Sequence, residues 1–248
     1  MNATVRSELV KLRTSRASLG LLGAGLVYAA FNGVATAAFA GRDGNAPLGS
    51  PSNIGNILRS GSVATWVVLL ASLLSITGEH RHRTITTTYL ATPHRGAVVR
   101  AKMNVYGMVG VGYALASMAV SLAAAMPRMV ASSTSVDLAD GHVVRMAFGL
   151  VVTTVLYGLA GIGIGALVPN QTAAAVGTLA WLVAAENIVG SVVGWRVARW
   201  FPGQAAAAAS GAGRDILLPM APGAALFAAY VLAAALIGAR VALGRDVI

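Results

Sequence analysis

The stretch richest in side chains that could do chemistry is residues 78–102, GEHRHRTITTTYLATPHRGAVVRAK. It contains three of the four histidines and five of the eighteen lysines and arginines of the chain. His80 and His82 have the H-x-H spacing of metal ligands, but without a third ligand nearby they are a weak indication of a metal site. The basic residues with Tyr89 and Leu90 would suit docking on another protein, and binding of anionic lipid headgroups is compatible with that.

Glu186 is the only acidic residue inside a predicted membrane span. A carboxylate at the bilayer centre costs about 2.5 to 3.5 kcal/mol on insertion scales, so it needs a partner, a water-filled cavity or a proton. One interpretation places Glu186, with Asn187 and Trp181, on a substrate path or at a dimer seam. The other makes it a hydrogen-bonded group that holds a neighbouring helix, with Asn187 close by. The residues alone leave both open.

Several reactive patterns are missing from the sequence. There is no GxxxxGK[ST] phosphate-binding loop, and neither Lys11 nor Lys102 follows a glycine. There is no cysteine, which excludes thiolate metal sites and cysteine nucleophiles. No Asp pair, Ser/Lys pair or Ser/His pair falls at a common depth. We therefore predict that the chain is not an enzyme and binds no metal or cofactor of its own.

The composition indicates what surrounds these residues. The chain is 56% hydrophobic and 10% charged, whereas soluble domains carry about 25% charged residues. So few charges cannot cover a soluble core of this apolarity, and the chain is predicted to be a membrane protein. The net charge of +10 comes from basic residues in short segments between apolar runs. That distribution favours orientation in a bilayer over binding of nucleic acid.

The apolar runs predict an all-α fold with six transmembrane helices, because a span needs roughly 20 mostly apolar residues. The first four are placed at residues 18–40, 60–77, 103–126 and 143–168, the third closing at Pro127. The last two are placed at 172–194 and 223–243. The fourth and fifth spans are joined at LVPNQT by only a few residues, which predicts a tight hairpin between them. Residues 195–222 are too polar and broken to span, and are predicted to be extracellular, lying flat or re-entrant.

Residues 1–17 are predicted to form an amphipathic helix on the membrane surface. Val5, Leu9 and Leu12 recur at i, i+4 and i+7, with Arg6 and Arg13 on another face. With both termini in the cytoplasm, inner segments hold eleven basic residues and outer segments seven, with the bias strongest near the first span. Residues 78–102 then form a cytoplasmic loop, in which Thr92-Pro93 predicts the start of a helix running into the third span.

Three stretches resemble the transmembrane subunits of ABC transporters of the type-2 exporter class, in the small actinobacterial form. SELVKLRTSRASL resembles the basic amphipathic connecting helix that opens such subunits. GEHRHRTITTTYLATPHRGAVVRAKM resembles the loop between spans two and three. GIGIGALVPNQTAAAVGTLAWLVAAENIVG resembles the glycine-rich end of span four, its tight turn and the fifth span. With the six-span plan, the likeness covers nearly the whole chain.

The resemblance implies a coupling helix within Glu79–Ala91 that fits a groove on a separate ATP-binding subunit. The implied contacts to the ATPase are Glu79, Arg81, Arg83, Thr84, Thr87, Tyr89 and Leu90. The connecting helix would contribute Arg6, Glu8, Lys11 and Arg13. The implied complex has two ATPase subunits, which carry ATP and Mg, and a second permease chain, identical or different.

The function expected from the resemblance is ATP-driven export of an amphiphilic or lipid-like compound, such as an antibiotic or drug, by alternating access. The substrate path would follow the dimer seam beside spans one, two and five, in a bacterial cell membrane. Two alternatives remain. A secondary transporter or channel working without ATP predicts repeated halves and several intramembrane charges. A membrane-embedded enzyme predicts a reactive cluster at one depth.

Overall fold

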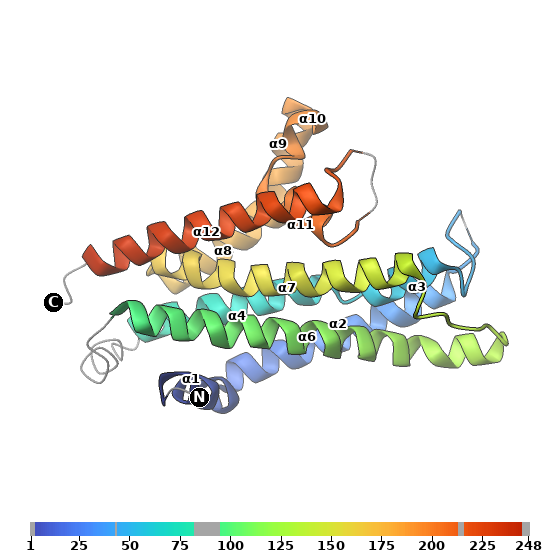
Figure 1. Ribbon diagram of the computed structural model, residues 1–248, viewed down its shortest axis with the longest axis horizontal. Coiled ribbons are helices and arrows are strands. Elements are labelled where there is room, and N and C mark those ends of the chain that lie inside the picture. The colour runs from blue at the N-terminus through green and yellow to red at the C-terminus, as the bar shows by residue number, and fades with distance from the viewer. Residues whose placement is uncertain (1–2, 43, 82–94, 213–215, 245–248) are drawn as a thin grey trace.

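The described part of the computed structural model excludes residues 1–2, 43, 82–94, 213–215 and 245–248, and it is helical, with no strand (Figure 1). Five helical stretches are long and apolar enough to cross a membrane. They are Arg16–Ala38, Val99–Ala131, Gly141–Leu167, Gln171–Val193 and Met220–Gly238. The all-α prediction is confirmed for these residues, and the five stretches indicate a polytopic membrane protein.

The helix at the predicted second span, α4 (Ser62–Arg81), has a shorter apolar stretch than the other five, Thr65–Glu79. It lies inside the bundle, packed against α2 (Arg16–Ala38), α6 (Arg95–Ala131) and α7 (Gly141–Leu167). Because neighbouring helices cover α4, its sequence need not be as apolar as that of a lipid-facing helix. Six spans therefore stay a prediction.

Glycines bring α7 close to its neighbours. A Cβ on Gly161 would lie 2.0 Å from Ser72 Oγ of α4, and one on Gly163 would lie 2.9 Å from the backbone of Ala234 in α12 (Met220–Gly244). Small residues let helices approach in lipid, where van der Waals packing drives association. The glycine-rich end of the predicted fourth span is thus used for close packing on two sides.

The predicted helix boundaries need two corrections. The third span was expected to close at Pro127, but α6 continues through it to Ala131. The fully buried Met129, in one apolar cluster with Ile54 and Val143, holds this last turn on the bundle. The second correction is an unpredicted helix, α3 (Pro51–Arg59), which Ser50 caps and whose buried face belongs to the same cluster.

The first described helix and the end of the last one lie at the same end of the bundle, as an even number of membrane crossings would require. α1 (Ala3–Thr14) lies beside the start of α2, and α4 ends, α6 begins and α12 ends at that same end of the bundle (Figure 1). α3 and the end of α6 lie at the opposite end (Figure 1). The hairpin between α7 and α8 (Gln171–Ala180) is as tight as predicted, since only three residues join them.

The stretch at the predicted fifth span, Gln171–Val193, is not a continuous α-helix. It consists of α8, a π-helical turn at Trp181–Ala185 and α9 (Glu186–Val193). It ends at Gly194, whose φ of 86° suits glycine. Two short helices follow, α10 (Trp195–Ala198) and α11 (Pro202–Ala209), and α11 packs against α12 and α7. Of the segment 195–222, the described residues thus include two short helices, and α11 folds back on the bundle.

Candidate functional site

Four charged side chains meet where α1, α4 and α6 come together, and we call Glu8, Lys11, Glu79 and Lys102 the charge cluster. Lys102 Nζ donates to Glu8 Oε2 at 2.5 Å and to Glu79 Oε1 at 3.0 Å. Lys11 Nζ donates to Glu8 Oε1 and to Glu79 Oε1, both at 2.7 Å. Each ammonium therefore bridges the same two carboxylates, and the four formal charges cancel.

Three members of the cluster are withdrawn from water. The side chains of Lys102, Glu8 and Glu79 are 1%, 3% and 11% exposed, while that of Lys11 is 47% exposed. Burying charges is costly unless the partners are close and further hydrogen bonds are made. Lys102 meets both conditions, since it also donates to Ser75 Oγ at 3.1 Å. The cluster is therefore stable only as a complete set.

The charged states in the cluster reinforce one another. Burial alone would raise the pKa of the Glu79 carboxyl, but the charges and hydrogen bonds of Lys102 and Lys11 outweigh it, and the pKa lies below its ordinary value. Burial alone would lower the pKa of Lys11, but hydrogen bonds to Glu79 and Glu8 outweigh it, and that pKa is raised. Both groups are therefore charged at neutral pH.

The cluster ties the N-terminal helix to both sides of the predicted coupling loop. α1 forms as predicted, and its apolar stripe, which includes Leu9 and Leu12, packs on buried Ile76 of α4 and Val105 of α6. Arg6 and Arg13 lie on its exposed face. Residues 82–94 connect α4 to α6, so a displacement of that loop acts on two helix ends that are both bonded to α1.

The structure places the predicted coupling residues unevenly. Glu79 lies in the charge cluster, and Arg81 is the last residue of α4. The other five coupling residues lie outside the described residues, as do His82 and the Thr92-Pro93 helix start: they are Arg83, Thr84, Thr87, Tyr89 and Leu90. The helix expected to continue through Arg95 and Arg100 into the third span is confirmed as α6.

Sequence reasoning missed the role of Lys102, which it counted only among the inner basic residues. One signal was present in the sequence. Glu79 follows one apolar run and Lys102 precedes the next, so two opposite charges stand at similar depth on adjacent helices. Glu8 and Lys11, three residues apart on the same helix, complete the set.

Glu186 is fully buried and hydrogen-bonded. Its carboxylate accepts from Trp181 Nε1 at 2.7 Å, from the backbone N–H of Gly203 at 2.8 Å and from that of Gln204 at 3.1 Å. The last two groups open α11, so Glu186 satisfies free donors at a helix start. Asn187 is exposed and donates to Val183 O instead of reaching Glu186. These contacts are those required of a group that holds a neighbouring helix.

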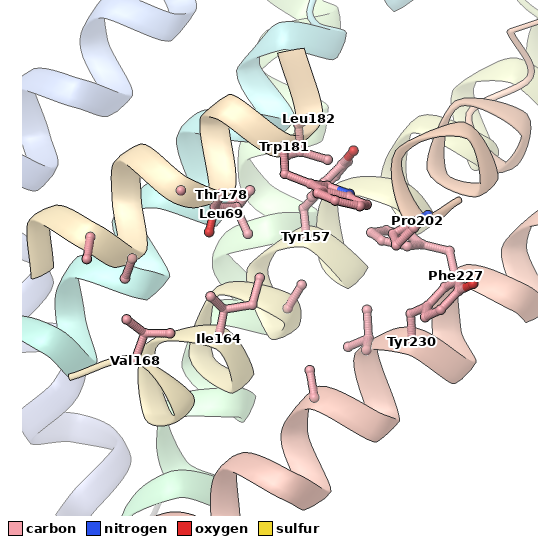
Figure 2. A pocket seen from close by; sticks show the side chains of 16 residues that line it. Leu69, Tyr157, Ile164, Val168, Thr178, Trp181, Leu182, Pro202, Phe227 and Tyr230 are labelled. Atoms are coloured by element: carbon pink, nitrogen blue, oxygen red, sulfur yellow. The ribbon is translucent and has the colours of Figure 1, made fainter. Parts of the chain in front are cut away.

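An apolar cavity of about 410 Å³ lies among α4, α7, α8, α11 and α12 (Figure 2). Trp181 and Leu182 line it from the π-helical turn, Tyr157 from α7, and Phe227 and Tyr230 from α12 (Figure 2). The Tyr157 ring packs edge-on against Phe227, with 4.9 Å between ring centroids. Such a cavity suits a hydrocarbon group.

A smaller cavity of about 130 Å³ adjoins it. Its lining is more polar, with Arg59 at the end of α3, Thr65 of α4 and Thr153 of α7. Tyr157 lines both cavities. In the described part of the chain, no group of three or more acidic or histidine side chains could hold a metal ion.

The chain matches no protein-family model. No curated protein matches it either. The functional argument below is therefore built on the site's geometry and on the resemblance of the three stretches.

Proposed function

We propose that this chain is the transmembrane permease subunit of an ATP-driven ABC exporter. A separate ATP-binding subunit, present in two copies with its ATP and Mg, docks on residues 78–102. A second permease chain completes the complex. The cargo is an amphiphilic or lipid-like compound or drug, moved across a bacterial cell membrane by alternating access.

The observation that supports this proposal most directly is the charge cluster. A permease driven from outside needs a rigid connection between the surface on which the driver pushes and the helices that move. Glu79 and Lys102 stand at the two helix ends that flank the proposed docking loop, and both bond to α1. A push on the loop is thereby transmitted to α4, α6 and α1 together rather than bending one helix end.

A second support is the division of labour in the sequence. Residues 1–248 contain no phosphate-binding loop, which supports binding of nucleotide by a partner subunit. Long apolar helices with a lateral apolar cavity suit a translocation pathway for compounds that partition into lipid. Together these features support a division in which this chain passes the cargo and its partner supplies the energy.

The deciding experiment is co-expression of this chain with an ATP-binding subunit encoded beside its gene. The expected result is a stable complex after purification whose ATPase activity in nanodiscs depends on the permease. Arg83→Ala combined with Tyr89→Ala should weaken assembly and lower that activity. Arg128→Ala, an exposed arginine at the far end of α6, is the matched control and should leave both unchanged.

Two results would overturn the proposal. One is unchanged assembly and coupling in the Arg83 and Tyr89 variant. The other is labelling of residues 78–102 from the outside of intact cells. Transport by the purified chain alone in liposomes would favour the secondary transporter or channel instead.

A further inference from the structure

The side chains that line the two adjoining cavities differ in polarity from one cavity to the other. On α4, Thr65 and Trp66 line the polar cavity and Leu69 the apolar one. On α7, Thr153 lines the polar cavity and Ala160 the apolar one. Residues three or four apart on a helix are neighbours on its surface. On α4 the lining thus changes from polar to apolar within one turn, and on α7 it changes over about two turns, from Thr153 to Ala160.

The third wall, α11, is shared by the two cavities. On α11, Pro202 lines the apolar cavity, whereas Gly203 and Ala206 line the polar one. Tyr157, which is common to both, lies at the boundary. α4 and α7 therefore place polar side chains around one cavity and apolar side chains around the other, with α11 as a shared wall, which is the form of a site for a molecule with a head and a tail.

The polar compartment favours a negatively charged head. Arg59 supplies a fixed positive charge, and guanidinium donors match carboxylate and phosphate oxygens. The Thr153 side chain is 2% exposed on a residue basis, and its hydroxyl is buried without a hydrogen-bond partner among the described residues. A buried polar group without a partner is rare, and a hydrogen-bonding atom of a bound head group would satisfy this one. The carboxylate of Glu186 lies behind Gly203 but is already satisfied by three donors.

The apolar compartment favours a single unbranched chain. Its lining follows α7 from Tyr157 past Ile164 to Val168, a length of about 16 Å at the helical rise per residue. Its axis therefore runs along the helices, as a lipid chain does in a bilayer. A cavity of about 410 Å³ has room for one such chain, and the polar cavity of about 130 Å³ has room for a small head with a few waters.

We propose that the two cavities form one binding site for an anionic single-chain amphiphile, with the head against Arg59 and Thr153 and the chain between α7, α8 and α12. All of the residues that line the site belong to one chain. This inference names the cargo class and so rests on the proposed function, but binding itself needs neither ATP nor the ATPase.

The test uses the full-length chain in nanodiscs, without nucleotide or ATPase. The probe is palmitate carrying a mid-chain diazirine and a terminal alkyne, cross-linked by light and mapped by mass spectrometry. Expected are saturable adducts on Trp181 and Tyr230, which line the apolar cavity. Unlabelled palmitate should compete at least about tenfold better than hexadecanol, because only the acid offers a charge to Arg59.

Variants separate the two halves of the site. Arg59→Gln should remove the preference for palmitate over hexadecanol, and Thr153→Val, which keeps the side-chain shape, should weaken palmitate binding several-fold. Gly177→Leu should abolish the adducts, since Gly177 lines the cavity and has open space in front of it. Gly112→Leu, at a helical glycine that also faces open space outside the cavity, should leave them unchanged.

Adducts that do not saturate, or that spread over outward-facing residues such as Phe31 and Val192, would overturn the inference. Equal competition by palmitate and hexadecanol in the unmodified chain would overturn the anionic head. The proposed function fails by a different measurement, loss of ATPase assembly, so the two failures are distinguishable.

Discussion

Lys102 Nζ lies 2.5 Å from Glu8 Oε2, which joins two residues 94 positions apart with both side chains almost fully buried. The contact fixes the N-terminal helix α1 to the beginning of α6. It also completes a ring, because Glu79 at the end of α4 bonds to Lys102 and to Lys11. α1 is therefore an integral part of the bundle end that carries the predicted coupling loop.

Removing Lys102 should strongly destabilise the protein. Lys102→Met keeps much of the side-chain volume but leaves two buried carboxylates with only Lys11, which is half exposed. Breaking a buried ion pair in this way costs about 3–5 kcal/mol. Thermal unfolding of the purified protein in detergent measures the effect. Arg100→Met, an exposed residue on the same helix, is the control, and an equal melting temperature for both variants would contradict the role of the cluster.

Acid should loosen α1. The pKa of Glu79 is below its ordinary value in the folded protein, so its stabilisation is complete above the ordinary value of 4.5 and is lost as the pH falls through the lower folded-state pKa. A spin label on Val10→Cys, at an exposed α1 position in a chain without native cysteine, reports the release. Its mobility should rise below about pH 4.5.

The matched label is Val130→Cys, exposed near the far end of α6, whose mobility should not change over the same pH range. In Glu79→Gln the amide does not titrate and the cluster is already incomplete, so the α1 label should be mobile at neutral pH and its acid transition should be smaller. An acid transition that persists unchanged in Glu79→Gln would show that another group controls α1.

These features were accessible from the sequence to different degrees. Long apolar runs predicted the helices well, because burial of the backbone in lipid allows little other than helix. The stripe of Val5, Leu9 and Leu12 predicted α1. It did not reveal that the stripe packs on α4 and α6, since an amphipathic pattern is the same for a helix on lipid and a helix on protein.

The charge cluster and the paired cavities could not be derived from periodicity, because both depend on which helices are neighbours. Lys102 and Glu8 are far apart in sequence, and no local pattern connects them. The same holds for Glu186, whose donors Gly203 and Gln204 come from α11. α3 was missed for a different reason: Ser50-Pro51 is a good helix start, but the segment is too short and polar to stand out as a span.

Close packing of α7 on α4 should make Gly161 intolerant of any side chain. A Cβ there would lie 2.3 Å from the backbone oxygen of Leu69 as well as against Ser72, so α7 and α4 must separate. Gly161→Ala should cost about 1–3 kcal/mol, measured as a lower melting temperature. Gly112→Ala adds the same methyl group at an open helical position and should not destabilise. Equal behaviour of the two variants would contradict the packing.

Glu186 should act as the anchor of α11. Glu186→Ala leaves the part-buried N–H groups of Gly203 and Gln204 and the indole N–H of the half-exposed Trp181 without their acceptor. Because water can replace part of what is lost, each group should cost less than the about 1–3 kcal/mol of a fully buried one. Glu186→Gln should destabilise the protein less than Glu186→Ala does, because its amide oxygen still accepts a hydrogen bond, although its NH₂ group faces another donor. The effect should be local, and hydrogen exchange at residues 202–209 should accelerate more than exchange at α7.

Asn187→Ala is the control for the anchor, since the Asn187 side chain is exposed and bonds only within its own helix turn. Its hydrogen exchange at residues 202–209 should match that of the unmodified chain. If Glu186→Ala leaves exchange at α11 unchanged but alters binding of the palmitate probe, Glu186 belongs to the substrate path rather than to the scaffold. If hydrogen exchange accelerates only at α11, Glu186 belongs to the scaffold that holds α11 in place.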